Sequence, residues 1–420
     1  MIEHLKNKWG YYLLGALILV FISFEARGEG DFSIFLAASR DLWGGKNVYT
    51  IMYQQWYHYY YGVFFAILLT PLNYVSLYLA KFLWLLLNTF FVYRTWKILS
   101  SWLPLEKLSK KALAVFTVLC FVFIFRFLRD NFHLSQLTIC ILYLTLEGLF
   151  FIEKDKKVAG AALIALGIDI KLLPIIIIPY LIYRKEWKAT IFVVAFILVF
   201  LFIPTLFIGY DFNILLLTER WNLLNPSNAA HVLDTSERSF HSLTTLLATL
   251  LVENTGDANH VLHIKRNIAD ISIEKLNMII NICRGILVLG TFWFLRTLPF
   301  RSATSKLHKL YEVSYLCLVV PLIFPHQQHY AFFFAFPAGT YLLFYLVYKY
   351  YNTGTTYVGT GFKSKRIVLS SLLFIVFILS SSHLLLGTFN EYYDHFKTLT
   401  YGMLLLLVTL VFCEPNKLNQ

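Results

Sequence analysis

The sequence predicts an all-α fold, a polytopic transmembrane helical bundle, and three observations lead to this class. Of the 420 residues, 58% are hydrophobic and only 14% are charged, which is too little charge to cover the surface of a soluble domain. Apolar runs that could cross or partly cross a bilayer recur from one end of the chain to the other. Lys and Arg gather in short clusters between these runs. We therefore expect residues 1–420 to form a single membrane domain.

The apolar runs define the expected helices, about 11–13 in all, some of them too short for a full crossing. The first is expected to stay uncleaved, because no small-residue cleavage site follows it. Two short segments meet at Asp169–Lys171 and are expected to form a hairpin that lines a cavity. The expected segments are 9–27, 61–70, 74–98, 111–129, 134–152, 158–170, 172–183, 188–208, 276–298, 310–324, 331–350, 368–385 and 397–413.

The basic clusters predict the orientation of these helices. When the helices alternate across the membrane, all the clusters fall on one side, which the positive-inside rule makes the cytoplasmic side. Both termini and the polar linker 351–366 are then cytoplasmic, in a plasma (inner) membrane. The first loop 25–60, the long loop 209–275 and the turn 325–330 lie outside. The same placement explains the net charge of +12 without nucleic acid.

Asp31 is the most informative carboxylate in the first outer loop. It follows the first helix within about two helical turns, so it should lie near the outer membrane surface. One interpretation is that Asp31 caps a short helix over 32–43 that Gly44 and Gly45 close. The other is that it is a general base at the lipid–water boundary, where a membrane-embedded substrate would present a hydroxyl. Both can hold together, whereas Asp41 should face elsewhere and be structural.

Positive residues on the outer side also need an explanation. Arg129, in the turn that Gln136 follows, could pair with Asp130 or snorkel, or it could bind a phosphate. Lys171, at the tip of the hairpin, is costly there unless it is paired or hydrated. Its partner could be Asp169, although the two lie only two residues apart and can face different ways, or it could be a lipid phosphate.

His326 and His329 lie in the turn between two apolar segments. Two histidines three apart could share a helix face and bind a metal ion, but no third ligand is evident nearby. We therefore expect them to hydrogen-bond a phosphate or a sugar, with no metal or other cofactor. The long outer loop holds Trp221, Asn222 and His231, which suit sugar binding, although a solvated loop would look the same. No DxD, GxGxxG or Walker motif is present, so no nucleotide site is expected.

Taken in order, these motifs resemble those of the GT-C glycosyltransferases and, more closely, of the bacterial family 87, which includes polyprenol-phosphate-mannose-dependent mannosyltransferases. The similarity spans about 25–345, and Ser135 departs from it where the family has glycine. The matching motifs are Asp31-Phe32, the turn from Gly44-Gly45 to Tyr49, Leu69-Thr70-Pro71-Leu72, Gln136 after the outer turn, Ile170-Lys171-Leu172-Leu173-Pro174, and Pro325 to His329.

The resemblance implies a GT-C type bundle and an inverting transfer of a hexose (mannose-like) or a pentose from a polyprenyl-phosphate donor to a glycan or glycolipid acceptor. Asp31 corresponds to the general base of the family. The expected substrate-binding residues are Lys171, Arg129, Gln136, His326, His329, Arg40 and Tyr49. A phosphate is already a good leaving group, so the chemistry needs positive charge and hydrogen-bond donors rather than a second carboxylic acid.

Two other classes of protein remain compatible with the sequence. A transporter or flippase of lipid-linked sugars could use the same cationic hairpin without a base, and a non-catalytic membrane subunit could share the architecture. The place of Asp31 in an ordered, aromatic outer loop favours an enzyme. No inverted repeat is evident, which weakly disfavours a transporter.

Overall fold

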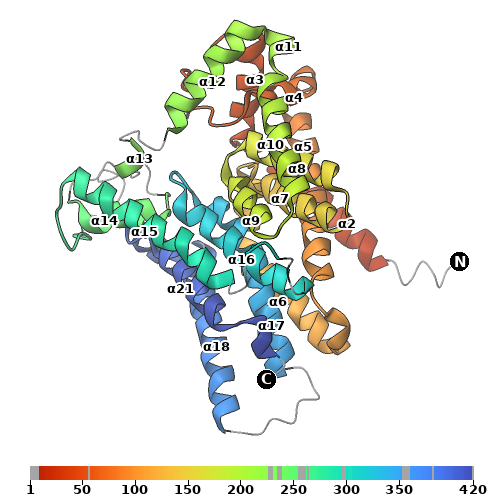
Figure 1. Cartoon of the computed structure of the whole chain (residues 1–420), viewed down its shortest axis with the longest axis vertical. Coiled ribbons are helices and arrows are strands. Elements are labelled where there is room, and N and C mark those ends of the chain that lie inside the picture. The colour runs from red at the N-terminus through yellow and green to blue at the C-terminus, as the bar shows by residue number, and fades with distance from the viewer. Residues whose placement is uncertain are drawn as a thin grey trace, which may run out of the picture.

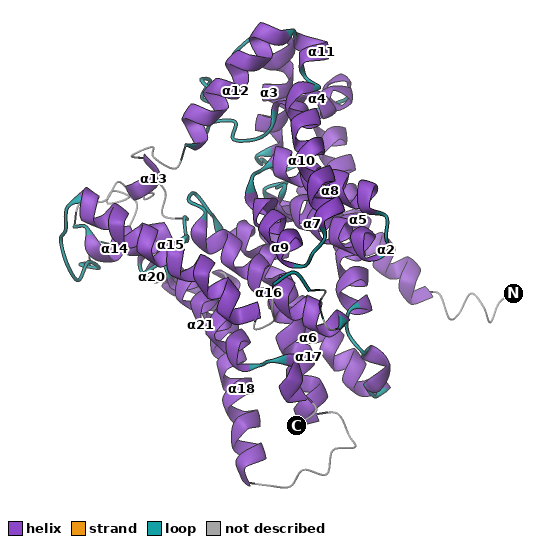
Figure 2. Ribbon diagram, in the orientation of Figure 1, coloured by secondary structure: helices purple, strands orange, loops and turns teal. Residues whose placement is uncertain are grey.

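The computed structural model describes residues 9–418, except 55–56, 226–229, 234–238, 254–261, 263, 296–298, 302, 304, 352–359 and 381–382. Within this part of the chain the secondary structure is helical, and the only strand-like contacts are two isolated β-bridges (Figure 2). Four described helices are each long and apolar enough to cross a bilayer, or five if a pair of helices bent by 77° counts as one span. The all-α, polytopic class is therefore confirmed. The total number of crossings stays a prediction, because several expected segments form shorter helices.

The N-terminal half follows the apolar runs closely. Ser76 and Ser109 cap two of its long helices by accepting a hydrogen bond from the backbone N–H three residues on. The 3₁₀ turn η3 (Leu173–Ile176) separates the two arms of the expected hairpin. The helices are α2 (Trp9–Glu25), α3 (Phe32–Trp43), α4 (Val63–Leu68), α5 (Leu77–Ser101), α6 (Lys110–His133), α7 (Thr138–Glu153), α8 (Lys157–Ile170), α9 (Ile177–Tyr183), α10 (Trp187–Phe202) and α11 (Thr205–Ile208).

The C-terminal half begins with three helices in the long loop 209–275: α12 (Tyr210–Leu224), α13 (Ala230–Leu233) and α14 (Leu243–Leu251). Residues 352–359 of the expected linker 351–366 lie outside the described residues, and helix α18 already begins at Thr360. The remaining elements are α15 (Ile273–Leu295), α16 (Lys306–Ile323), the 3₁₀ turn η5 (His329–Ala335), α17 (Phe336–Leu346), α18 (Thr360–Leu379), α19 (His383–Leu386), α20 (Asn390–His395) and α21 (Thr398–Phe412).

Helix α8 packs between α7 and α10, and α5 packs on α7. Two glycines explain the close approach of α7 and α8. A Cβ on Gly148 would lie 2.5 Å from Ile164 Cγ1, and one on Gly160 would lie 2.5 Å from the Gly148 carbonyl oxygen. Small residues at such a crossing let two membrane helices pack backbone to backbone.

A second group of helices forms around α17. Helix α16 packs on α17, α18 packs on α21, and α6 contacts both η5 and α17. Figure 1 shows α6, α16 and α17 between the α5–α7–α8–α10 group on one side and α15, α18 and α21 on the other. The apolar span 329–351 is fully enclosed, whereas most of the apolar surface of 187–208 and 273–292 is exposed. Exposed apolar faces of this size are expected to contact lipid.

Candidate active site

A cavity of about 560 Å³ lies between the two groups of helices, with walls from both halves of the chain. Its size, its aromatic and aliphatic walls and its few polar groups are typical of a ligand pocket. The lining residues from the N-terminal half are Asp31, Ile34, Phe35, Tyr57, His58, Tyr60, Tyr61, Lys171, Leu172 and Leu173. Those from the C-terminal half are Trp221, Leu224, His231, Phe240, Arg284, Val288, Ile323, Phe324, Pro325, His326, Gln327, Gln328 and Tyr330.

Asp31 takes the N-cap position of α3, as one sequence interpretation expected, but its side chain makes no capping hydrogen bond. Instead the carboxylate accepts a hydrogen bond from Gln136 Nε2. The backbone N–H of Asp31 donates to the Leu134 carbonyl at 2.9 Å, and Gly30 leaves no room there, since a Cβ would lie 2.9 Å from the same oxygen. The connection from α2 to α3 is therefore docked on the turn that carries Gln136.

The turn that carries Gln136 requires an unusual backbone conformation at Ser135. Its φ is +53°, in the left-handed region that glycine adopts freely and other residues adopt at a cost of about 1 kcal/mol. The family that the sequence resembles has glycine at this position. Serine keeps the same backbone conformation in this chain, and Gln136 still reaches Asp31.

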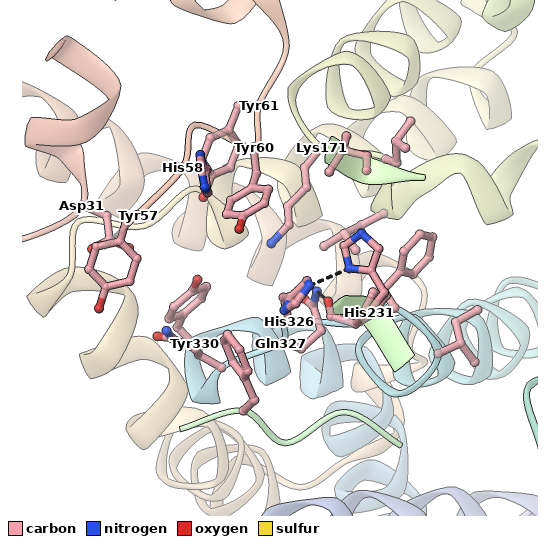
Figure 3. A pocket seen from close by; sticks show the side chains of 18 of the residues that line it. Asp31, Tyr57, His58, Tyr60, Tyr61, Lys171, His231, His326, Gln327 and Tyr330 are labelled. Atoms are coloured by element: carbon pink, nitrogen blue, oxygen red, sulfur yellow. Dashed lines mark hydrogen bonds between the residues drawn. The ribbon is translucent and has the colours of Figure 1, made fainter. Parts of the chain in front are cut away.

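Lys171 lies in the turn between α8 and η3 and extends into the pocket (Figure 3). The pair with Asp169 that the sequence left open is not formed, because Asp169 lies 3.6 Å from Arg220 Nη1 and its carbonyl accepts from Arg220 Nη2 at 2.6 Å. Within the described residues, the Lys171 ammonium makes no hydrogen bond or ion pair. Burial lowers the pKa of Lys171 to about 8, and the charge of Asp31 opposes this shift.

The tyrosines of the segment between α3 and α4 fold onto the tip of the hairpin. Tyr49 is buried, and its hydroxyl donates to the Tyr61 carbonyl at 2.8 Å. Gly62 donates its N–H to the Ile170 carbonyl at 3.3 Å, and a Cβ on Gly62 would collide with Asp169. Tyr49 therefore supports the pocket wall from behind and does not line it.

His326 forms the opposite wall, and its φ of +55° turns it away from the regular backbone. Its Nε2 lies 2.6 Å from His231 Nδ1, and its ring stacks on Tyr60 with centroids 6.2 Å apart. Figure 3 shows the ammonium of Lys171 in the space between Tyr60 and His326. The pocket thus brings a carboxylate, an ammonium and a pair of histidines together on aromatic walls.

Comparison with known families gives a match to the family model of glycosyltransferase family 87 over residues 59–325, which is more than half of the chain. The chain belongs to glycosyltransferase family 87. The protein is thus a membrane glycosyltransferase, as the sequence motifs predicted. The matched region contains Gln136 and Lys171; it begins after Asp31 and ends just before His326. No curated protein matches the chain.

Besides Tyr49 and Gln136, three of the expected substrate-binding residues do not line the pocket of this family 87 glycosyltransferase. Arg129 is 40% exposed and lies 3.6 Å from Asp130 Oδ1, as the ion-pair interpretation expected. Arg40 is exposed on α3, and its Nε donates to the Leu36 carbonyl at 3.4 Å. His329 contacts residues behind the pocket wall, so it does not share a face with His326. Substrate contacts by these three residues stay predictions.

Arg284 is a pocket residue that the sequence analysis missed. It lies on α15, and its Nη2 donates to Thr244 Oγ1 at 2.7 Å. The available signal was a charged residue within the apolar run 276–298, because such residues are often functional. Tyr57, His58 and Tyr60 were also missed, since nothing in a tyrosine-rich loop distinguishes a lining residue from a packing residue.

Proposed function

We propose that this family 87 glycosyltransferase transfers a hexose (mannose-like) or pentose unit from a polyprenyl-phosphate donor to a glycan or glycolipid acceptor. The observation that carries the proposal is that Asp31 and Lys171 line one pocket, where the charge of Asp31 acts on the pKa of Lys171. A base for the acceptor and a cation for the donor phosphate are the two groups that this transfer requires.

The acceptor side of the reaction uses Asp31. The acceptor hydroxyl oxygen attacks the anomeric carbon, its proton passes to the Asp31 carboxylate, and the bond from that carbon to the phosphate oxygen breaks. Gln136 holds the carboxylate in one orientation by its hydrogen bond. A single displacement of this kind inverts the configuration at the anomeric carbon. The phosphate leaves as an anion, so no carboxylic acid is needed on the opposite side.

The donor side uses Lys171 and the histidine pair. A charge-assisted contact from Lys171 would stabilise the negative charge that grows on the leaving phosphate. His326 and His231 lie across the pocket, with Nε2 of the first 2.6 Å from Nδ1 of the second, and add polar groups to this wall. Leu172, Leu173 and other aliphatic side chains beside the ammonium suit an isoprenoid chain. A lipid-linked donor also agrees with the lack of nucleotide-binding motifs in the sequence.

The proposed location is the plasma (inner) membrane, with both termini in the cytoplasm and the pocket at the outer face. The basic clusters support this orientation through the positive-inside rule. The exposed apolar faces of 187–208 and 273–292 support contact with lipid on both sides of the molecule.

Donor specificity is the direct test. The purified full chain in lipid nanodiscs is incubated with a membrane glycan extract as the acceptor. The donor is short-chain polyprenyl-phosphate mannose, the corresponding polyprenyl-phosphate pentose, or a nucleotide-diphosphate sugar that carries the same mannose or pentose. We expect released polyprenyl phosphate, detected by mass spectrometry, and a product of inverted anomeric configuration. A fluorescent short-chain polyprenyl phosphate should also bind the protein when no acceptor is present. Sugar transfer from the nucleotide donors alone, or no binding of the lipid, would refute the proposal.

A further inference from the structure

Three metal-ligating side chains from distant parts of the chain converge behind the pocket wall. His241 precedes α14, His329 begins η5, and Asp394 lies in α20. The Nε2 atoms of His241 and His329 are 2.9 Å apart, and the Oδ1 atom of Asp394 lies 3.4 Å from the first and 3.2 Å from the second. All three side chains are largely enclosed, with at most 17% of each exposed.

Hydrogen bonds alone do not satisfy this triangle of atoms. A neutral imidazole carries one N–H, and each Nε2 faces both the other Nε2 and an acceptor oxygen. If only one ring is protonated at Nε2, the lone pair of the other ring faces the Asp394 carboxylate. If both are protonated there, two N–H groups face each other. The buried Nδ1 of His241 has no hydrogen-bond partner among the described residues, so no neighbour fixes the tautomer of that ring.

A metal ion would satisfy all three atoms at once. Zinc binds His nitrogen and Asp oxygen at about 2.0–2.2 Å, so two ligands in a tetrahedral arrangement lie roughly 3.3 Å apart. The three distances here, 2.9, 3.2 and 3.4 Å, bracket that separation. Two imidazoles and one carboxylate are a donor set that favours zinc and its transition-metal neighbours over magnesium or calcium.

The surrounding charges are compatible with a cation. Two carboxylates lie close by, Asp394 in the triangle itself and Asp130, whose Oδ2 is 3.7 Å from Arg126 Nε. Arg126 is the nearby guanidinium, and it is engaged by the Ser380 carbonyl at 3.0 Å and by the Tyr393 hydroxyl. The ammonium of Lys397 is a second positive charge near His241, so the Asp394 carboxylate is needed to offset these positive charges.

We infer that His241, His329 and Asp394 bind a divalent transition-metal ion of the zinc type. The ion would fix the position of the pocket wall from the side that faces away from the cavity. Phe240 and Gln328, the neighbours of the two histidines, form an isolated β-bridge and both line the pocket. The ion would join this bridge to α20. It does not line the pocket, so its role is positioning, and the inference stands independently of the proposed donor.

Metal analysis of the full chain tests the site. The protein is purified with an affinity tag other than polyhistidine, dialysed against zinc, desalted and analysed by mass spectrometry for bound metal. We expect about one zinc ion per chain, and at least about a tenfold loss in His241→Gln, His329→Gln and Asp394→Asn. His231→Gln is the matched control, since it removes the other close histidine pair and should keep the metal. Chelation of the wild-type protein should lower its melting temperature, and zinc should restore it.

Cobalt substitution provides a second test, which applies even if a glutamine variant does not fold. His241→Cys keeps a ligand at this position, so the cobalt-loaded variant should gain a thiolate-to-cobalt charge-transfer band that cobalt-loaded wild-type protein lacks. A wild-type chain that binds no stoichiometric zinc, or ligand variants that keep it, would overturn the inference. An equal loss of metal in His231→Gln, or a His241→Cys protein without the new band, would also overturn it.

Discussion

The sharpest test of the catalytic mechanism is Asp31→Asn, because it removes the proton acceptor and keeps the shape of the side chain. The structure limits what else this change can do. Asp31 makes no capping hydrogen bond, so the stability of α3 does not depend on its carboxylate. The substitution weakens the hydrogen bond from Gln136 without abolishing it, because an asparagine oxygen can still accept. We expect a change in unfolding free energy of no more than about 1 kcal/mol.

The effect on turnover should be far larger than the effect on stability. Loss of a general base lowers a rate by about 10²–10⁴-fold, equivalent to roughly 3–5 kcal/mol of transition-state free energy. The assay is the release of polyprenyl phosphate under saturating donor, measured beside the melting temperature of each variant. Asp31→Ala should be as inactive as Asp31→Asn, because both lack the acceptor.

Asp41→Asn is the matched control for this experiment. Asp41 lies on the same helix, pairs with Lys46 at 2.8 Å and does not line the pocket, so its loss should leave turnover within about twofold of wild type. Full activity of Asp31→Asn would refute the assignment of Asp31 as the base. An equal loss in Asp41→Asn would show that the activity responds to any change in α3 and would refute the same reasoning.

Four further predictions concern the cationic site, the topology and the core. Lys171→Ala should weaken donor binding about 10–100-fold and leave the melting temperature unchanged, whereas Lys46→Ala should change neither quantity. An unchanged donor affinity in Lys171→Ala would make Lys171 structural. Because the pKa of Lys171 is about 8 and a phosphodiester does not titrate near neutral pH, the donor KM should rise about tenfold between pH 7 and pH 9, and a flat profile would contradict this. In intact cells, a membrane-impermeant maleimide should label Lys46→Cys and not Glu106→Cys; the reverse pattern would place the pocket inside. Glu312→Gln leaves Arg184 buried without the carboxylate that its Nε contacts at 2.9 Å, so it should cost about 3–5 kcal/mol, and an unchanged melting temperature would argue against that ion pair.

Local patterns in the sequence were enough to predict most of the architecture. Most of the described helices follow the expected apolar runs, because a segment that must satisfy its own backbone hydrogen bonds in lipid has few alternatives to a helix. Helices α12, α13 and α14 were not predicted, since they lie in the loop 209–275. The short helix Phe32–Trp43 was predicted from Asp31 and the two glycines that follow the helix, and Gly45 has the positive φ of 72° that closes such a helix. The hairpin around Lys171 was predicted from two short runs and a proline.

Partners of side chains depended on the tertiary structure. The spacing left Asp169 as a candidate partner for Lys171, but Asp169 is paired with Arg220, 51 residues further along the chain, which leaves Lys171 to the pocket. The sequence likewise placed His326 and His329 in one turn. The positive φ of His326 separates them, so one faces the pocket and the other faces behind it.

Asp394, the third residue of the proposed metal site, and Gln136, the partner of Asp31, also depended on the tertiary structure. Asp394 lies 65 residues from His329, and Gln136 lies 105 residues from Asp31, so neither contact follows any periodicity in the chain. The amino-acid sequence by itself determined which segments are apolar and helical and which residue types could do the chemistry, since these depend on composition and near neighbours. Which of those residues share one cavity was decided only by helix packing, because contacts between distant segments depend on how whole helices fit together.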